Sequence, residues 1–172
     1  LKNAVSPEDM CRQYGCDSLR LYEMFMGPLQ QSKPWNTAGV EGVYRFLGRV
    51  WRLFTDESSV DAFEQKLTVL GEDAAGAEDA MREIRLHPLI TNDSPSPDQL
   101  TLLHRTIKKL TDDLQTMSFN TAISALMVFV NEAMTWPNRP VSALREFLLL
   151  LAPFAPHIAE ELYGLLGQKR SI

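Results

Sequence analysis

The strongest constraint on the fold is a run of apolar residues that recur alternately three and four positions apart. The run follows Ser96-Pro97-Asp98 and consists of Leu100, Leu103, Ile107, Leu110, Leu114 and Met117. This spacing places all six side chains on one face of an α-helix, and Ser-Pro-Asp is typical of a helix start. A similar stripe follows within 118–136. The chain therefore predicts long helices that each bury one face against other helices.

Helix signals recur along the whole sequence. Further helices are predicted over 7–14, 18–26, 37–54, 60–71, 74–86, 142–152 and 156–166, with Gly, Pro and short polar residues between them. The expected N-terminal caps of four of these helices are Ser6, Asp17, Asn36 or Thr37, and Ser142. Period-two alternation is missing, and no hairpin dipeptide joins two apolar runs. The sequence predicts an all-α fold, an antiparallel helical bundle of four or five main helices.

The segment 33–54 combines a basic helix face with two glycines. At about 100° per residue, Arg45, Arg49 and Arg52 share one face. The opposite face is apolar and holds Val40, Val43, Tyr44, Leu47, Trp51 and Phe54. Guanidinium groups bind phosphate oxygens bidentately, whereas a solvated helix face explains the same pattern without a ligand. Gly39 and Gly42 each cost roughly 1 kcal/mol against Ala, so we expect another backbone to approach there, or tight packing against Trp35.

Charge is distributed unevenly. The chain has a net charge of −5, but residues 56–97 hold ten acidic and three basic residues, a net of −7. The remainder therefore has 14 basic and 12 acidic residues, a net of +2. The acidity belongs to one segment, and the rest of the chain is compatible with an anionic partner.

Motifs for catalysis, metal binding and membrane insertion are missing from the sequence. There is no Gly-rich phosphate loop, nucleophile elbow or zinc motif, and the three histidines lie far apart. Cys11 and Cys16 are expected to be free thiols that point to different faces of one helix. The longest apolar run, 147–156, is too short for a membrane helix and is stopped by prolines. We therefore expect no catalytic residue, no metal site and no membrane partner in this chain.

Three stretches resemble class I aminoacyl-tRNA synthetases. Residues 6–28 read SPEDMCRQYGCDSLRLYEMFMGP and resemble the segment after the KMSKS signature, where a D-[AST]-L-R stretch leads into a helical bundle. Residues 35–54 read WNTAGVEGVYRFLGRVWRLF and resemble the first bundle helix of leucyl-tRNA synthetases. Residues 118–133 and 152–167 resemble the third and last stretches of that bundle. Isoleucine and valine enzymes share the last motif in form, but W-N-x-x-G-V-E-G-x-x-R-F-L indicates leucine.

The resemblance implies two parts: linker helices at 1–34, and a helical-bundle anticodon-binding domain at 35–172 with an acidic insert at about 56–97. It implies that the bundle positions tRNA(Leu) for ATP-dependent aminoacylation by a catalytic domain of the same chain. The HIGH and KMSKS motifs of that domain are missing here, and the sequence does not start with Met, so we expect a piece of a longer chain. This piece would be inactive alone and need no cofactor. The parent would be a cytoplasmic monomer.

The resemblance also assigns roles to individual residues. It makes Arg45, Arg49 and Arg52 the candidate contacts to tRNA phosphates, and Arg20 a structural ion-pair former. Because acidic side chains repel RNA, we expect the acidic insert to face away from it. Two other interpretations remain open: the bundle of an isoleucine or valine ligase, and a helical protein-interaction module with no RNA role. A basic face surrounded by acids would favour the interaction module.

Overall fold

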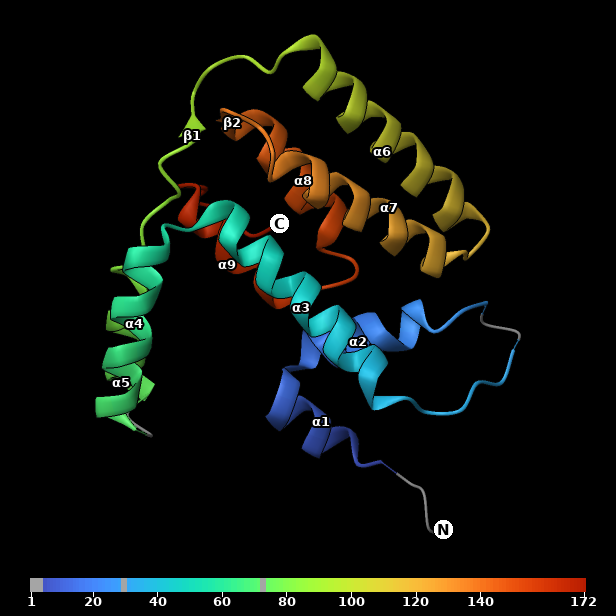
Figure 1. Cartoon of the computed structure of the whole chain (residues 1–172), viewed down its shortest axis with the longest axis horizontal. Coiled ribbons are helices and arrows are strands. Elements are labelled where there is room, and N and C mark those ends of the chain that lie inside the picture. Colours follow the sequence, from blue (N-terminus) through green and yellow to red (C-terminus); the bar gives the residue numbers. More distant parts are fainter. Residues whose placement is uncertain (1–4, 29–30, 72–73) are drawn as a thin grey trace.

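Helices account for nearly all regular structure in the computed structural model, which describes residues 5–28, 31–71 and 74–172 (Figure 1). They are α1 (Pro7–Tyr14), α2 (Cys16–Phe25), α3 (Thr37–Phe54), α4 (Glu57–Leu70), α5 (Ala74–Met81), α6 (Pro97–Gln115), α7 (Phe119–Ala133), α8 (Val141–Leu151) and α9 (Pro156–Leu165). Two strands, β1 (Ile90–Thr91) and β2 (Arg139–Pro140), form a parallel pair. The predicted all-α fold is confirmed. The strand pair was not predicted, because two residues are too few to show an alternating pattern.

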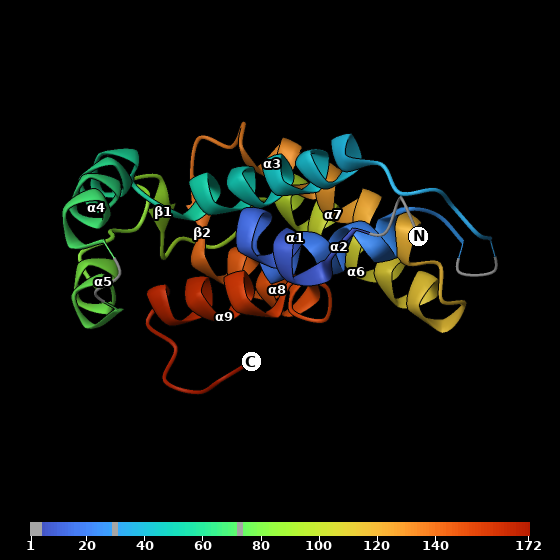
Figure 2. The ribbon, with the colours of Figure 1, turned by 90° about the horizontal axis from the view of Figure 1, so that it is seen from below.

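Helices α3 and α6 to α9 form the bundle, and α6 to α9 alternate in direction (Figure 1). Helix α2 packs against α3, α7 and α9, and α1 contacts both α2 and α3. Helices α4 and α5 form a hairpin that projects from one end of the bundle (Figures 1 and 2). Among the described helices, none has both the length and the apolar character that crossing a bilayer requires. Most side chains of the hairpin are exposed, because its apolar residues recur with only weak helical periodicity.

A stack of three phenylalanine rings joins α3, α7 and α8 at the centre of the core. Phe129 and Phe147 lie with their ring centroids 4.7 Å apart and their planes 8° from parallel. Phe54, the last residue of α3, stacks on Phe147 at 6.5 Å. All three side chains are fully buried. Aromatic residues contribute large buried areas and specific ring geometry, so this stack fixes how the three helices meet.

Helix starts follow the predicted capping residues in three places. Ser6 caps α1, with its hydroxyl accepting from the Asp9 N–H, and Pro7 is the first helical residue. Asn36 caps α3 by accepting from the Ala38 N–H at 3.1 Å. Ser96 and Gln99 form a reciprocal capping box at the start of α6. The cap predicted for α8 is wrong: Pro140 precedes its first residue, and Ser142 lies inside the helix.

Asp17 has a different role from the one predicted. It lies inside α2, which begins at Cys16, and its carboxylate reaches α9 instead. It accepts a hydrogen bond from the Ile158 N–H at 2.8 Å, and its Oδ1 lies 3.4 Å from His157 N and 2.8 Å from His157 Nδ1. Helix α9 has no capping side chain of its own. Asp17 therefore satisfies the free N–H groups at the start of a helix 140 residues further along the chain.

Arg20 also connects α2 to the chain just before α9. Its Nη2 donates to the Pro153 carbonyl oxygen at 2.9 Å, and its Nε donates to the same oxygen at 3.3 Å. Within the described part of the chain Arg20 has no ion pair, so the predicted ion-pair role is replaced by a carbonyl contact. Ser18 and Leu21 are buried beside it. The stretch Asp17-Ser18-Leu19-Arg20 thus holds α2 against the turn between α8 and α9.

The two cysteines lie closer together than the sequence predicted. Both are free thiols, but Gly15, with a φ of 83°, ends α1 between them. The pKa of the Cys11 thiol lies above its ordinary value, chiefly because of a hydrogen bond with the Cys16 side chain, with burial and nearby charge adding to the effect. The prediction of different faces was wrong because it assumed one continuous helix.

Gly39 makes room for an aromatic side chain. A Cβ built there would overlap the Tyr22 ring of α2, with Tyr22 Cδ2 and Cζ only 3.2 and 3.3 Å away. The Tyr22 hydroxyl accepts from the Asn36 N–H at 2.8 Å, and its ring meets Trp35 edge-on at 4.9 Å. A ring, rather than another backbone, therefore approaches this glycine. A Cβ at Gly42 would meet nothing within 4 Å.

This contrast gives a matched pair of substitutions on α3. Gly42→Ala is expected to raise the free energy of unfolding by about 0.5 to 1 kcal/mol, because Ala is the better helix former. Gly39→Ala is expected to lower it by about 1 to 3 kcal/mol, because the cost of overpacking against Tyr22 exceeds the same gain. Urea denaturation of both variants checks this. Equal shifts for the two would show that Tyr22 does not constrain position 39.

Arg139 is a buried cation at the junction of α3, α7 and β2. Its side chain has no carboxylate partner among the described residues. Its Nη1 donates to the Leu53 carbonyl at 2.8 Å and its Nη2 to the Met134 carbonyl at 3.4 Å. These oxygens lie at the C-terminal ends of α3 and α7, where the helix dipoles favour a positive charge. Burial lowers the pKa of the guanidinium. Nothing in the local sequence indicated that this arginine would be buried.

Candidate nucleic-acid interface

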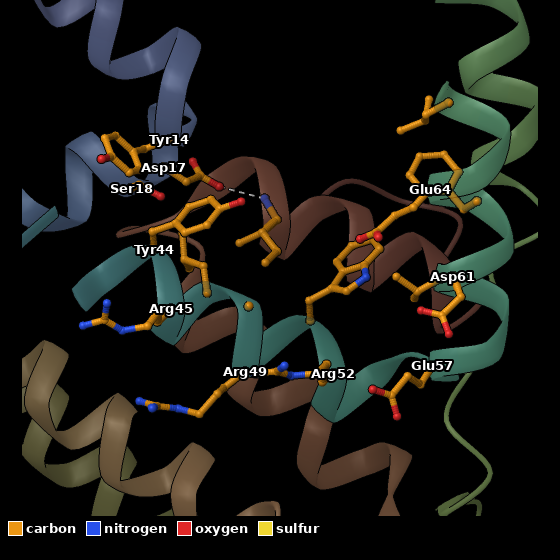
Figure 3. Close-up of a pocket in the computed structure, with 17 residues that line it drawn as sticks. Tyr14, Asp17, Ser18, Tyr44, Arg45, Arg49, Arg52, Glu57, Asp61 and Glu64 are labelled. Atoms are coloured by element: carbon orange, nitrogen blue, oxygen red, sulfur yellow. Dashed lines mark hydrogen bonds between the residues drawn. The ribbon is translucent and has the colours of Figure 1, made fainter. Parts of the chain in front are cut away.

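Arg45, Arg49 and Arg52 project from one side of α3, as the helical period predicts (Figure 3). Arg45 and Arg52 are exposed and Arg49 is half-buried. Arg45 Nη1 lies 3.9 Å from a carboxylate oxygen of Glu41, one turn earlier, which is a long and solvated ion pair. Arg49 and Arg52 have no ion-pair partner among the described residues, and the Arg49 Nε is buried without a hydrogen bond. Two of the three guanidinium groups are therefore free to bind an anion.

These arginines line an open groove of about 780 Å³ between α3 and α4. Aromatic and apolar side chains cover much of the rest of it: Tyr14, Tyr44, Leu47, Trp51, Val60, Phe63, Leu67 and Ile158. Tyr44 is 52% exposed and meets Tyr14 edge-on at 5.8 Å. The α3 wall of the groove thus combines cationic groups with partly exposed rings.

The apolar stripe predicted for α3 was partly wrong. Val40, Val43, Leu47 and Phe54 are buried as predicted, but Tyr44 and Trp51 lie at the groove. Phe46, Val50 and Leu53 are buried instead. The reason is that α3 contacts α2, α7 and α9 together, so its buried face is wider than that of a helix with one neighbour. The arginine face remains opposite the core.

The acidic segment does not face away from the arginines. Glu57, Asp61 and Glu64 of α4 line the same groove, on the wall across from α3 (Figure 3). The spacing of these acids, four and three residues apart, places them on one face of the helix. A sharp turn between the end of α3 and the start of α4 brings this face round to the arginines. These three acids therefore face the arginines, and the expectation that the insert faces away from bound RNA stays a prediction.

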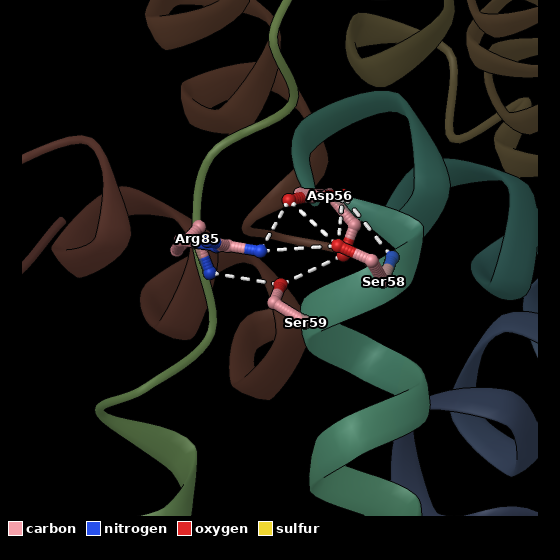
Figure 4. Close-up of polar contacts among 4 residues, drawn as sticks. All are labelled: Asp56, Ser58, Ser59 and Arg85. Carbon is pink, nitrogen blue, oxygen red and sulfur yellow. Dashed lines mark hydrogen bonds and ion pairs between the residues drawn. The ribbon is translucent and has the colours of Figure 1, made fainter.

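A polar cluster at the base of the hairpin fixes this orientation (Figure 4). The Asp56 N–H donates to the Arg85 carbonyl at 2.8 Å, and Arg85 Nη2 lies 2.9 Å from Asp56 Oδ2. Ser58 donates to Asp56 from its hydroxyl at 3.0 Å and from its N–H at 3.1 Å. The Ser59 hydroxyl accepts from the Arg85 N–H at 3.0 Å. The beginning of α4 is thereby tied to the chain that leaves α5.

The Asp56 carboxyl gives this cluster a pH dependence. Its pKa lies below the ordinary value of 3.8, chiefly because the Ser58 hydroxyl donates to it, with the Ser58 N–H and Arg85 adding to the effect. A carboxyl whose pKa is lower in the folded than in the unfolded state stabilises the fold at pH values above its unfolded-state pKa. This stability is lost as the pH falls through its folded-state pKa. The base of the hairpin is expected to loosen only below about pH 3.8. NMR shifts of the Ser58 and Arg85 amides should report this, and Asp56→Asn should remove it.

The remaining titratable groups form no candidate metal site in the part of the chain that the structure describes. Within 5–28, 31–71 and 74–172, no three His, Cys, Asp or Glu side chains are grouped so that they could hold a metal ion. His87 has a lowered pKa, chiefly because it is partly buried and also because it lies near Arg139. It belongs to the base of the hairpin, where its N–H donates to the Phe54 carbonyl at 2.8 Å.

Comparisons with known proteins agree with the helical architecture and the sequence motifs. Residues 99–172 match the family model of the anticodon-binding domain of tRNA ligase. Leucine–tRNA ligase of Flavobacterium psychrophilum is 43% identical over 170 residues, a match that covers 99% of this chain and 15% of that protein. The corresponding enzyme of Borrelia duttonii is 39% identical over 172 residues, covering 100% of this chain and 17% of that protein. The chain thus spans about a sixth of the length of these relatives.

A solved structure shows the same fold. LeuRS agnB2 of Agrobacterium radiobacter K84, solved in a ternary complex with tRNA and LeuAMS, superposes with a TM-score of 0.68 at 27% sequence identity. The match covers 99% of this chain and 20% of that protein. Neither an isoleucine or valine ligase nor a protein-interaction module without an RNA role is favoured by these relatives. The chain therefore carries the anticodon-binding helical region of a class I tRNA ligase, and over its whole length it is similar to leucine–tRNA ligases.

Proposed function

We propose that this chain is the tRNA-binding bundle of a leucine–tRNA ligase and that it positions tRNA(Leu) for aminoacylation by a catalytic domain of the same polypeptide. Residues 1–34 would form the linker helices from that domain, and residues 35–172 the bundle, with 56–97 as its acidic insert. The parent enzyme would use ATP, act as a monomer and work in the cytoplasm. This chain would contribute positioning and no chemical step.

One observation carries the proposal. Arg45, Arg49 and Arg52 lie on a single side of α3, and two of the three lack an ion-pair partner among the described residues. Guanidinium forks match the geometry of phosphate oxygens, and three along one helix can follow a nucleic-acid backbone. Contacts of this kind fix the orientation of an RNA without reading its sequence. Such contacts suit a domain that holds tRNA while another domain acts on its end.

The test is a titration of this chain with a leucine tRNA and an unrelated tRNA at several salt concentrations. Each phosphate contact releases counterions, so each of Arg45→Ala, Arg49→Ala and Arg52→Ala is expected to reduce the salt slope by about 0.7 to 0.9. The matched controls are Arg12→Ala, Arg82→Ala and Arg105→Ala, which remove arginines that do not line the groove. These controls should leave the slope nearly unchanged. Equal effects from both sets would reject α3 as the docking surface.

A further inference from the structure

The acids of α4 that line the groove differ from two other acids of the hairpin, Asp79 and Glu83. Glu57, Asp61 and Glu64 have no ion-pair partner within 4 Å among the described residues. By contrast, Asp79 pairs with Arg82 at 3.0 Å, and Glu83 pairs with Lys66. The paired acids lie on the other side of the hairpin, where Asp79 and Glu83 line a separate depression. Glu78, which lines a different pocket, also has no ion-pair partner among the described residues, so three of the four unpaired acids described in α4 and α5 face α3.

The position of Glu57, Asp61 and Glu64 opposite α3 is fixed by contacts at the base of the hairpin. The polar cluster of Asp56, Ser58, Ser59 and Arg85 fixes how the hairpin leaves the bundle (Figure 4). Helix α4 starts at Glu57, between Asp56 and Ser58 of that cluster, so its first groove-lining acid is placed by the same contacts. The groove consequently has a cationic wall on α3 and an anionic wall on α4 (Figure 3). A polyanion that binds the cationic wall on α3 is therefore repelled wherever it comes close to the anionic wall on α4.

We propose that Glu57, Asp61 and Glu64 act as an electrostatic selector that keeps RNA backbones out of the groove. An RNA would then have to lie along the outer side of Arg45, Arg49 and Arg52. An RNA whose shape fits the outer side of α3 would bind. An RNA that can reach the arginines only through the groove would be repelled by the three carboxylates. This inference rests on the proposed function, because it assigns specificity to the same arginine face.

Whether the three carboxylates can repel an RNA depends on the distance over which their charges act on its phosphates. Two unit charges about 10 Å apart in water interact by roughly 0.4 kcal/mol before screening, and the Debye length is about 30 Å at 0.01 M salt but about 8 Å at 0.15 M. Several carboxylate–phosphate pairs therefore add up at low salt and are largely screened at physiological salt. Removing the three charges is expected to tighten the binding of a poorly fitting RNA about tenfold at low salt.

The experiment compares two charge-matched triple variants of this chain. The first is Glu57→Gln, Asp61→Asn, Glu64→Gln. The control is Asp93→Asn, Asp112→Asn, Glu132→Gln, which changes the net charge equally at exposed acids that do not line the groove. Both are titrated with a leucine tRNA, an unrelated tRNA and polyuridylate at low and moderate salt. Circular dichroism confirms that each variant is helical.

The proposal expects the groove variant to bind the unrelated tRNA and polyuridylate about tenfold more tightly at low salt, with a smaller gain for leucine tRNA and for the control. Unchanged or weaker binding, or an equal gain in the control, would overturn it. The proposed function fails separately, when the three arginine-to-alanine substitutions leave the salt slope unchanged. If neither the unmodified chain nor the groove variant binds any RNA at low salt, both proposals are rejected.

Discussion

Replacing Phe147 with alanine is expected to lower the free energy of unfolding of this chain by about 3 to 5 kcal/mol, which is the usual range for a large aromatic residue in a core. Phe147 is fully buried and stacks on Phe129 on one side and on Phe54 on the other. Truncation therefore removes contacts to α3 and α7 at once and leaves a cavity where three helices meet. Urea denaturation monitored by circular dichroism measures the loss.

Leu149→Ala provides the control on the same helix. Leu149 is 39% exposed, so its truncation loses less buried surface and is expected to cost clearly less, on the order of 1 kcal/mol. A similar cost for the two substitutions would mean that the aromatic stack does not organise the core. A changed slope of the urea transition would instead indicate that the denatured or native state had changed its compactness.

Replacing Asp17 with alanine is the second change with a large expected effect. The side chain is 10% exposed and accepts from the start of α9, so its loss leaves N–H groups of that helix without an acceptor. Hydrogen bonds to a charged group contribute about 1.5 to 3 kcal/mol, and we expect a loss of about 2 kcal/mol in the free energy of unfolding. Hydrogen exchange should also speed up at the His157 and Ile158 amides before the rest of the bundle opens.

Two further variants separate this role from a general effect of charge. Asp17→Asn keeps an oxygen acceptor and is expected to recover part of the loss. Asp9→Ala removes an exposed acid of α1, whose ion pair with Arg12 is solvated, and is expected to cost less than about 1 kcal/mol. Faster exchange at the Ile158 amide in the Asp9 variant would contradict the assignment of Asp17 as the cap of α9.

The elements that the sequence predicted well are those specified by neighbouring residues. The alternating spacing of Leu103 and Leu110 marks α6, and the capping box of Ser96 and Gln99 marks its start, because these interactions span three or four positions. The buried face of α6 was predicted only in part, since Leu100, Leu114 and Met117 are exposed. The contacts that it missed join distant parts of the chain. Asp17 was assigned to its own helix because its real partner, α9, lies 140 residues away. Arg139 likewise gave no local sign that it would be buried between two helix ends.

The candidate site also has one part that the sequence predicted and one part that it did not. The common face of Arg45, Arg49 and Arg52 follows from the helical period alone. The opposing wall depends on the angle between α3 and α4, which the contacts of Asp56 with Arg85 decide. No pattern within either helix encodes that angle. The sequence could therefore indicate the cationic face but not the acids that lie across from it.

The base of the α4–α5 hairpin also bears on how this region can vary. Thr55 and Leu86 form an antiparallel bridge, and the His87 N–H donates to the Phe54 carbonyl at 2.8 Å. The chain thus leaves the bundle and returns to it at nearly the same point, which is the geometry that tolerates inserted segments of different length and sequence. The hairpin can therefore be shortened, lengthened or exchanged over generations while the bundle keeps its core. Under the selector proposed above, the preference for one RNA over another would change there at little cost to folding.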